Sequence, residues 1–130
     1  MGIFSSFIQN GDNWYNRATF CLDAGNYQEA IAYYKRAVWN NPQDVNAWVY
    51  MGLAFYKIGN LIEAINCFNH TIALDPGCVH AIYNKATVLV ELGELEEAIK
   101  LYDEALKLDP YFSKAKLNKN KALKLLNQDK

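Results

Sequence analysis

The side chains best suited to chemistry in this sequence are two cysteine–histidine pairs. Cys67 precedes His70 by three residues, and Cys78 precedes His80 by two. Thiolate and imidazole groups are the usual ligands of structural zinc. However, these spacings differ from the usual zinc modules, and the first pair falls within an expected helix. We therefore expect no metal site and no bound cofactor.

An enzyme would need a nucleophile with a neighbouring base, paired carboxylates in a pocket, or a glycine loop that holds phosphate. We find none of these arrangements in the sequence. The glycines fit turns, helix-packing positions and the N-terminus. The acidic run Glu94, Glu96 and Glu97 begins an expected helix, where negative charge is favourable. We expect a protein that is not an enzyme.

Charge is distributed unevenly along the chain. Its 130 residues suit one domain with a real core, and its formal net charge is −1. Residues 1–112 hold seven Lys and Arg against thirteen Asp and Glu, which gives −6, whereas residues 113–130 hold six Lys against one Asp, which gives +5. The small net charge argues against a general nucleic-acid or membrane binder. We expect neither as a partner.

The cysteines and the start of the chain indicate a compartment. Three cysteines, Cys21, Cys67 and Cys78, are an odd number without the spacing of a disulfide framework. No apolar run approaches the roughly 20 residues of a membrane-spanning helix. The first residues lack the basic start and long apolar stretch of a secretory signal. We expect reduced thiols in a cytoplasmic protein. Residues 1–6 also fit the short N-myristoylation pattern at Gly2, which leaves lipidation open.

Five residue types recur every 34 residues. They are Pro42, Pro76 and Pro110; Gly25, Gly59 and Gly93; Glu29, Glu63 and Glu97; Ala30, Ala64 and Ala98; and Ile31, Ile65 and Ile99. Proline lacks an amide proton, so it marks the links between repeats. The glycine falls where the left-handed residue that ends a helix is usually found. The alanine falls where two helices approach closely and a larger side chain would overpack.

Between these markers the apolar residues follow helical spacing rather than strand alternation. In the second repeat one face carries Trp48, Met51, Gly52 and Phe55. We expect helices at 12–24, 27–40, 45–58, 61–74, 79–92, 95–108 and 113–127. One repeat alone would leave its apolar faces exposed, so about three must stack to bury a core.

This pattern resembles the tetratricopeptide repeat, which has Trp, Leu-Gly, two aromatics, two alanines and Pro at fixed offsets. The matching residues are Trp14, Ala18, Ala30, Tyr34, Ala37 and Pro42; Trp48, Gly52, Phe55, Ala64, Phe68 and Pro76; and Ala86, Ala98, Tyr102, Ala105 and Pro110. Ile82 in place of Trp and Thr71 in place of Ala depart from it. The resemblance implies an all-α fold, a right-handed α-solenoid of three repeats (11–44, 45–78 and 79–112). An apolar segment, 1–10, would precede the repeats, and a basic capping helix and tail, 113–130, would follow them.

In this family the first helices of the repeats line a concave groove. By resemblance, its peptide-binding residues would be Tyr15, Asn16, Thr19, Asn46, Val49, Tyr50, Leu53, Tyr56, His80, Tyr83, Asn84, Thr87 and Asn118. Tyrosine offers rigid, amphipathic contact area that suits protein recognition. Three of the groove asparagines recur in phase, with Tyr50 at the missing step. Their amides could hold a peptide backbone, or they could be ordinary exposed polar residues.

Some family members grip the C-terminal carboxylate of heat-shock chaperones with lysine, asparagine and arginine. The corresponding residues here are Tyr15, Thr19, Tyr50, His80 and Asn84. A frame shifted by one repeat gives Val49, Leu53, Asn84, Lys114 and Asn118, of which only Asn84 and Lys114 agree. Because a carboxylate needs a basic clamp, we expect no strong binding of that ligand.

The resemblance implies a protein–protein interaction module, an adaptor, scaffold or co-chaperone-like protein, that binds a peptide or protein segment. The alternative is a self-assembling structural repeat. Its contacts would come from the N-terminal segment, with Ile3, Phe4, Phe7 and Ile8, or from the basic cap. The lysines of this cap and tail are Lys114, Lys116, Lys119, Lys121, Lys124 and Lys130.

Overall fold

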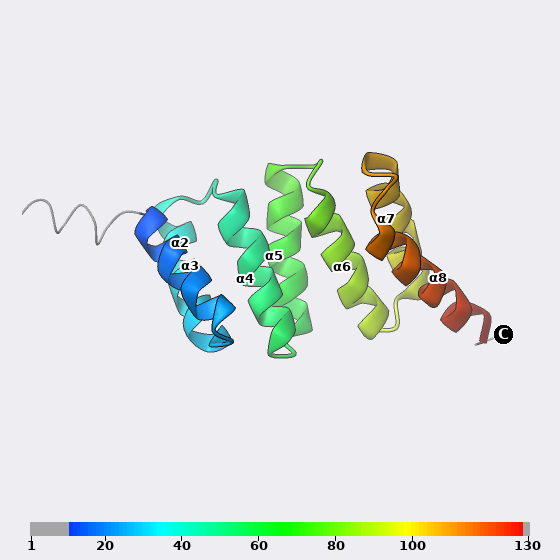
Figure 1. Ribbon diagram of the computed structural model, residues 1–130, viewed down its shortest axis with the longest axis horizontal. Helices are drawn as coiled ribbons and strands as arrows, with labels where there is room; N and C mark the ends of the chain where they lie inside the picture. The colour runs from blue at the N-terminus through cyan, green and yellow to red at the C-terminus, as the bar shows by residue number, and fades with distance from the viewer. Residues whose placement is uncertain (1–10, 129–130) are drawn as a thin grey trace, which may run out of the picture.

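The chain is built from helices stacked in order. The computed structural model describes residues 11–128, and every regular element among them is an α-helix. The helices are α2 (Gly11–Asp23), α3 (Tyr27–Asn40), α4 (Val45–Lys57), α5 (Leu61–Leu74), α6 (Val79–Glu91), α7 (Leu95–Leu108) and α8 (Ser113–Gln128). They follow one another along the long axis of the molecule, from α2 at one end to α8 at the other (Figure 1).

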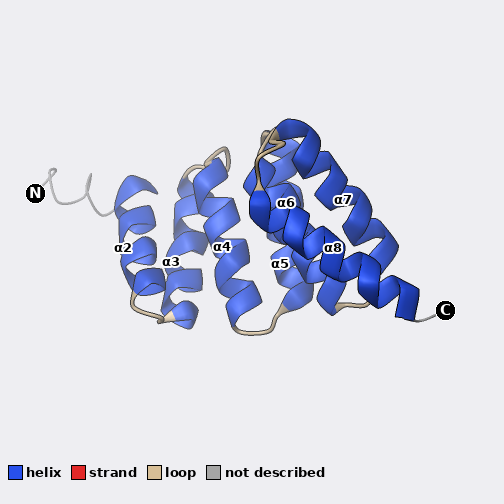
Figure 2. Cartoon of the chain, turned by 45° about the vertical axis from the view of Figure 1, so that its right-hand side comes forward, coloured by secondary structure: helices blue, strands red, loops and turns tan. Residues whose placement is uncertain are grey.

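Neighbouring helices pair by repeat. α2 packs on α3, α4 on α5, and α6 on α7, while α3 meets α4 and α5 meets α6 to join the repeats. The last helix, α8, packs on α7 and also touches α6. Figure 2 shows these helices joined by short loops. The expected all-α solenoid is confirmed.

The recurring glycines end the first helix of each repeat. Gly25, Gly59 and Gly93 have φ of +82°, +83° and +84°, a left-handed conformation that L side chains rarely adopt. The expected helix ends at 24, 58 and 92 were one residue late. The chain leaves the helix one residue earlier: Ile58 and Leu92 are the C-caps of α4 and α6.

The links between repeats share a recurring hydrogen bond from the backbone to a side chain. The side chains of Asn41, Asp75 and Asp109 each accept a hydrogen bond from the backbone N–H two residues later, at 3.2, 3.2 and 3.1 Å. Each of these residues directly precedes a recurring proline. Such Asx turns fix the direction of the link. The proline and the Asn or Asp before it therefore both set the path of the chain between repeats.

The core combines small residues with aromatic and aliphatic side chains. Ala30, Ala64 and Ala98 are fully buried, in agreement with the close helix approach expected from their spacing. Thr71, which departs from the repeat pattern, is also buried, and its hydroxyl donates to the carbonyl of Cys67 at 3.0 Å. The buried hydroxyl is therefore satisfied within its own helix.

α8 closes the described part of the chain. Ala115 and Ala122 are buried, and Lys119 Nζ lies 2.6 Å from Asp103 Oδ1 of α7. The rest of the helix presents mostly polar side chains to solvent. Within residues 11–128, no helix is both long and apolar enough to cross a membrane. The N-terminal segment 1–10, with Gly2, and Lys130 lie outside the described residues.

Candidate peptide-binding groove

The first helices of the repeats and α8 run along one side of the solenoid. α2 contacts α4, α4 contacts α6, and α6 contacts α8, although each pair is separated in sequence by another helix. Three side-chain contacts along this row join residues exactly one repeat plus one residue apart. They are Tyr15 with Tyr50, Tyr56 with Glu91, and Tyr83 with Asn118.

Three tyrosine rings cluster at the N-terminal end of this row. Tyr15 lies 6.3 Å from Tyr50 and 6.0 Å from Tyr34 between ring centroids, and Tyr34 lies 6.5 Å from Tyr50. The hydroxyl of Tyr34 is hydrogen-bonded to Thr19 Oγ1 at 3.0 Å. Burial raises the pKa of Tyr34 to about 12. The structure thus brings the expected residues Tyr15, Thr19 and Tyr50 together around Tyr34.

Tyr34 comes from a second helix and was not expected at the groove. The sequence held a signal for it, because Thr19 and Tyr34 recur two repeats later as Thr87 and Tyr102. That second pair is also hydrogen-bonded, at 2.9 Å between hydroxyl oxygens. The recurring pair therefore joins the two helices of the repeat in both the first and the third repeats.

A pocket of about 600 Å³ opens between α4, α6 and the start of α8. The expected groove residues that line it are Asn46, Val49, Tyr50, Leu53, His80, Tyr83 and Asn84. The others are Cys78, Asp109, Tyr111, Phe112, Ser113 and Lys114, which the groove expectation did not include. Tyr15, Asn16, Thr19, Tyr56, Thr87 and Asn118 lie on the same row of helices but do not line this pocket.

Two aromatic residues in the last link form one wall of the pocket. Phe112 lies 4.8 Å from Tyr83 and 5.5 Å from His80 between ring centroids. Tyr111 is 93% exposed. The earlier links carry Gln43 and Gly77 where the last link has Tyr111. A comparison of the three links would have revealed this aromatic residue at a position that is not aromatic in the other two.

The asparagine row is divided by the structure. Asn118 donates through Nδ2 to the hydroxyl of Tyr83 at 2.7 Å, so part of its amide is already engaged. Asn84 is half-buried at the edge of the pocket, and its amide bonds to no other residue in the range 11–128. Asn16 is exposed outside the pocket. Asn84 is therefore the member of the row that lines the pocket with an amide not engaged by another described residue.

Tyr56 is tied to the neighbouring repeat rather than free. Its hydroxyl donates to Glu91 Oε1 at 2.6 Å. This hydrogen bond to a carboxylate, together with partial burial, raises the pKa of Tyr56 to about 12. Tyr56 therefore braces α4 against α6 beyond the pocket.

The two cysteine–histidine pairs lie in different hollows. Cys78 and His80 line the concave pocket, whereas Cys67 and His70 line a hollow between α3 and α5. Packing accounts for Cys67, which is buried, and for His70, which stacks on Trp48 at 4.1 Å. Among the described residues, no group of three His, Cys, Asp or Glu could hold a metal ion.

Several known proteins are similar to this chain. Residues 23–105 match the model of the family described as anaphase-promoting complex, cyclosome, subunit 3. The first TPR of Spaghetti (RPAP3) bound to HSP90 peptide SRMEEVD is 23% identical, with a TM-score of 0.88 over 92% of this chain and 94% of that chain. YrrB, described as a TPR protein with an unusual peptide-binding site, is 29% identical, with a TM-score of 0.82 over 85% of this chain and 57% of that one.

The second TPR domain of human RPAP3, in complex with HSP70 peptide SGPTIEEVD, is 24% identical, with a TM-score of 0.83 over 88% of this chain and 95% of that one. No curated protein sequence matches the chain. The family match spans more than half of the sequence, and the solved structures share its helical solenoid. The matching model is of the tetratricopeptide-repeat type. The chain therefore belongs to the tetratricopeptide-repeat family.

Proposed function

We propose that this chain is a protein-interaction module that holds a peptide or protein segment in its concave groove and catalyses no reaction. The observation that carries the proposal is the pocket of about 600 Å³ between α4, α6 and α8. It combines aromatic walls with a few convergent polar groups, which is the usual make-up of a binding site. The peptide complexes described for the two RPAP3 domains support this use of the fold.

Two side chains of the pocket have the clearest roles. Tyr50, which is 36% exposed, belongs both to the tyrosine cluster and to the pocket lining, and it presents a ring to a bound segment. Asn84 offers an amide that can donate to and accept from a peptide backbone at once. Lys114 and Asp109 add one charge of each sign at the α8 end. A short segment with an apolar anchor and a polar backbone contact fits these groups.

The chaperone carboxylate is not the ligand that we propose. The corresponding clamp positions carry Tyr15, Thr19, Tyr50, His80 and Asn84, none of which is a lysine or an arginine. Lys114 is the only lysine or arginine that lines the pocket. Isothermal calorimetry with the peptide SRMEEVD should therefore give no binding heat at micromolar concentrations. Strong binding of this peptide would contradict the assignment.

The proposal is tested by selecting peptides from a displayed library on the immobilised chain. Tyr50→Ala and Asn84→Ala should each weaken the selected peptides about tenfold or more, because a truncated anchor or an unmet polar group costs roughly 1–3 kcal/mol. Ile62→Ala, an exposed apolar residue of α5 outside the pocket, is the matched control. Circular dichroism confirms the fold of each variant. Selected peptides that ignore both groove substitutions would refute the site.

A second candidate function is a structural repeat that assembles through its N-terminal segment or its basic cap. α8 supports it by exposing Leu117 and Leu125 among its lysines. In that case the mass in solution rises with concentration and falls when residues 1–10 are removed or the α8 lysines are neutralised. We also propose a reducing compartment, the cytoplasm, because Cys21, Cys67 and Cys78 are all free thiols.

A further inference from the structure

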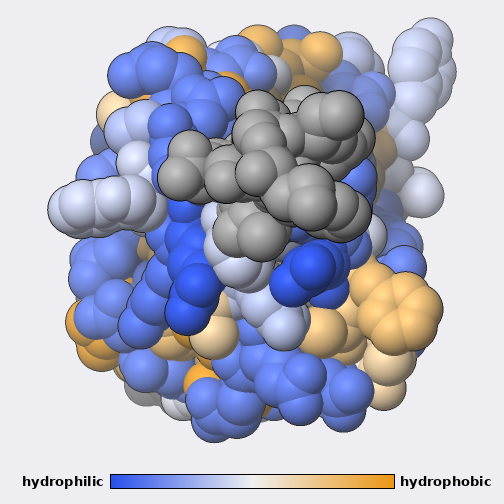
Figure 3. Space-filling model, turned by 90° about the vertical axis from the view of Figure 1, so that its left-hand side faces the viewer, coloured by the Kyte–Doolittle hydropathy of each residue, from blue (hydrophilic) through white to orange (hydrophobic). Residues whose placement is uncertain are grey.

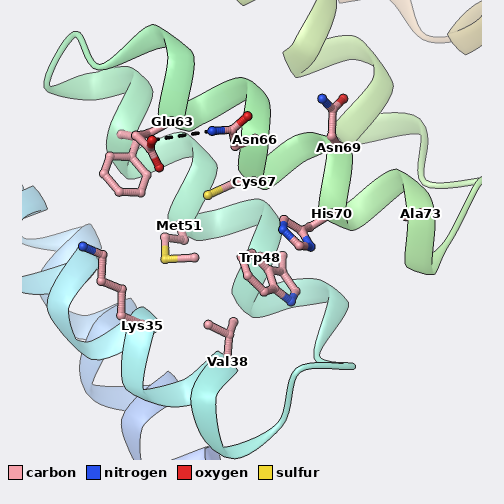
Figure 4. A pocket seen from close by; sticks show the side chains of 11 residues that line it. Lys35, Val38, Trp48, Met51, Glu63, Asn66, Cys67, Asn69, His70 and Ala73 are labelled. Carbon is pink, nitrogen blue, oxygen red and sulfur yellow. Dashed lines mark hydrogen bonds between the residues drawn. The ribbon is translucent and has the colours of Figure 1, made fainter.

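The outer side of the solenoid carries a second hollow, which we call the outer groove. It lies between α3 and α5, has a volume of about 600 Å³, and is lined by Lys35, Val38, Trp48, Met51, Phe55, Glu63, Asn66, Cys67, Asn69, His70 and Ala73. Figure 4 shows α4 beneath it, carrying Trp48 and Met51, with Lys35 and Val38 on one side and Glu63 and His70 on the other. None of these residues lines the concave pocket.

Two residues that line this groove, Met51 and Cys67, distinguish the second repeat from the third. One repeat later, between α5 and α7, the position of Met51 is taken by Lys85 and that of Cys67 by Leu101. Leucine is larger than cysteine, and lysine places a charge where the outer groove has a thioether. At both positions the second repeat has a residue that the third repeat does not share.

The walls of the outer groove are already fixed. Trp48 donates through Nε1 to the carbonyl of Pro42 at 2.9 Å and is stacked on His70 with an interplanar angle of 10°. Lys35 Nζ lies 5.9 Å from the centre of the Phe55 ring, within reach of a cation–π interaction. A groove whose side chains are held in this way loses little conformational entropy when it is filled.

A tryptophan stands beside the groove and does not fill it. Trp39 is 86% exposed, and it follows Lys35 by four residues on α3, so the two side chains share one side of that helix. The corresponding residues of the other repeats are Ala73 and Lys107. Burial of a tryptophan removes about 150–250 Å² of surface from water. Trp39 is therefore the side chain of α3 with the most apolar surface left to bury at an interface.

We propose that two copies of this chain pair through their outer faces, with Trp39 of each copy seated in the outer groove of the other. A two-fold interface needs the projecting group and its receptor on the same patch, and here both belong to the surface around α3. An inserted indole N–H meets acceptor oxygens on Glu63, Asn66 and Asn69. The entering copy also brings its Lys35 toward Glu63, the acidic residue among those that line the groove.

Such a pair leaves both concave pockets open, because the outer groove shares no lining residue with them. The dimer then presents two peptide sites, and a partner that carries two copies of the motif binds with avidity. This inference does not depend on the identity of the concave ligand, since association is measured on the chain alone.

The test is sedimentation equilibrium of the full chain over a concentration series. We expect a monomer–dimer equilibrium whose Kd rises at least about 30-fold in Trp39→Ala, the effect of losing an interface hot spot. Cys67→Leu, which copies Leu101 of the third repeat into the groove, should weaken the dimer without touching Trp39. Phe20→Ala removes another exposed aromatic residue, on α2 and outside the groove, and should leave the dimer unchanged.

Circular dichroism verifies that each variant is folded. A chain that stays monomeric up to millimolar concentration would overturn the proposal, as would a dimer that Trp39→Ala leaves intact. A dimer lost on removal of residues 1–10 but insensitive to both Trp39→Ala and Cys67→Leu would assign assembly to the N-terminal segment instead.

Discussion

Gly52 lies in the middle of α4 at a position where the other repeats carry Ala18 and Ala86. A Cβ atom placed on Gly52 would lie 2.6 Å from Cε1 and 2.9 Å from Cδ1 of Phe68, and Phe68 is fully buried. Ordinary carbon–carbon contacts are about 3.5–4.0 Å, so Gly52→Ala forces the Phe68 ring to move by roughly 1 Å within a packed core.

Two effects oppose each other in Gly52→Ala. Alanine favours a helix interior over glycine by about 1 kcal/mol. Overpacking a core by one methyl costs about 1–3 kcal/mol. The net change is therefore a loss of about 0–2 kcal/mol in the free energy of unfolding. With Phe68→Leu in the background, the ring is gone, and Gly52→Ala should instead stabilise the fold by up to about 1 kcal/mol.

The assay is urea unfolding of four proteins, the wild type, both single variants and the double variant, followed by circular dichroism. The coupling energy between the two positions should be about 1–3 kcal/mol. Ala86→Gly is the matched control in the third repeat, where the helix already accommodates a methyl group. If Gly52→Ala changed stability equally with and without the Phe68 ring, the close contact would not be what excludes alanine there.

Three further outcomes are expected. Tyr102→Phe should cost about 0.5–1.5 kcal/mol in urea unfolding, because it removes the hydrogen bond to Thr87 while Thr87 keeps its bond to a backbone carbonyl; no loss would show that the pair is not stabilising. The pKa of Tyr56 is raised to about 12, so its contribution to stability is present below pH 10 and is lost between pH 10 and 12. Glu91→Gln should lower that pKa toward 10 in a tyrosinate absorbance titration, and an unchanged titration would disprove the cause. Cys78 is the half-buried cysteine, so it should react first with a thiol reagent at pH 8, ahead of the two buried thiols whose pKa values are raised by burial.

The architecture was predictable because each helix boundary carries its own local signal. A glycine with φ near +83° ends the first helix, and a proline follows the second, so helix ends were placed within one residue. The burial of Ala30, Ala64 and Ala98 follows from the same register. These features depend on residues close in sequence, which a single sequence displays directly.

The pocket was only partly predictable, because part of its wall comes from the link before α8, and the repeat pattern treats links only as connections between helices. Tyr111 and Phe112 belong to the loop before α8, and a family pattern assigns no ligand contact to that loop. Tyr34 was expected only as one of the aromatic residues of the family pattern, yet its hydroxyl reaches Thr19 of the first helix. The sequence signals for both, the unmatched Tyr111 and the recurring threonine–tyrosine pair, appear only when the three repeats are compared position by position.

The row of groove asparagines shows where periodicity misleads. Residues that recur every 34 positions occupy equivalent places, but side chains in contact across first helices are 35 positions apart, as in Tyr56 with Glu91 and Tyr83 with Asn118. Asn118 therefore contacts Tyr83 of the preceding first helix rather than another asparagine. Asn118 can clamp a peptide fully only if it gives up its 2.7 Å bond to Tyr83. The residue 35 positions before Asn84 is Val49, which has no hydroxyl to offer the amide. Val49 occupies the position that Tyr15 and Tyr83 hold in the first and third repeats. This apolar residue is thus what leaves the Asn84 amide open to a ligand.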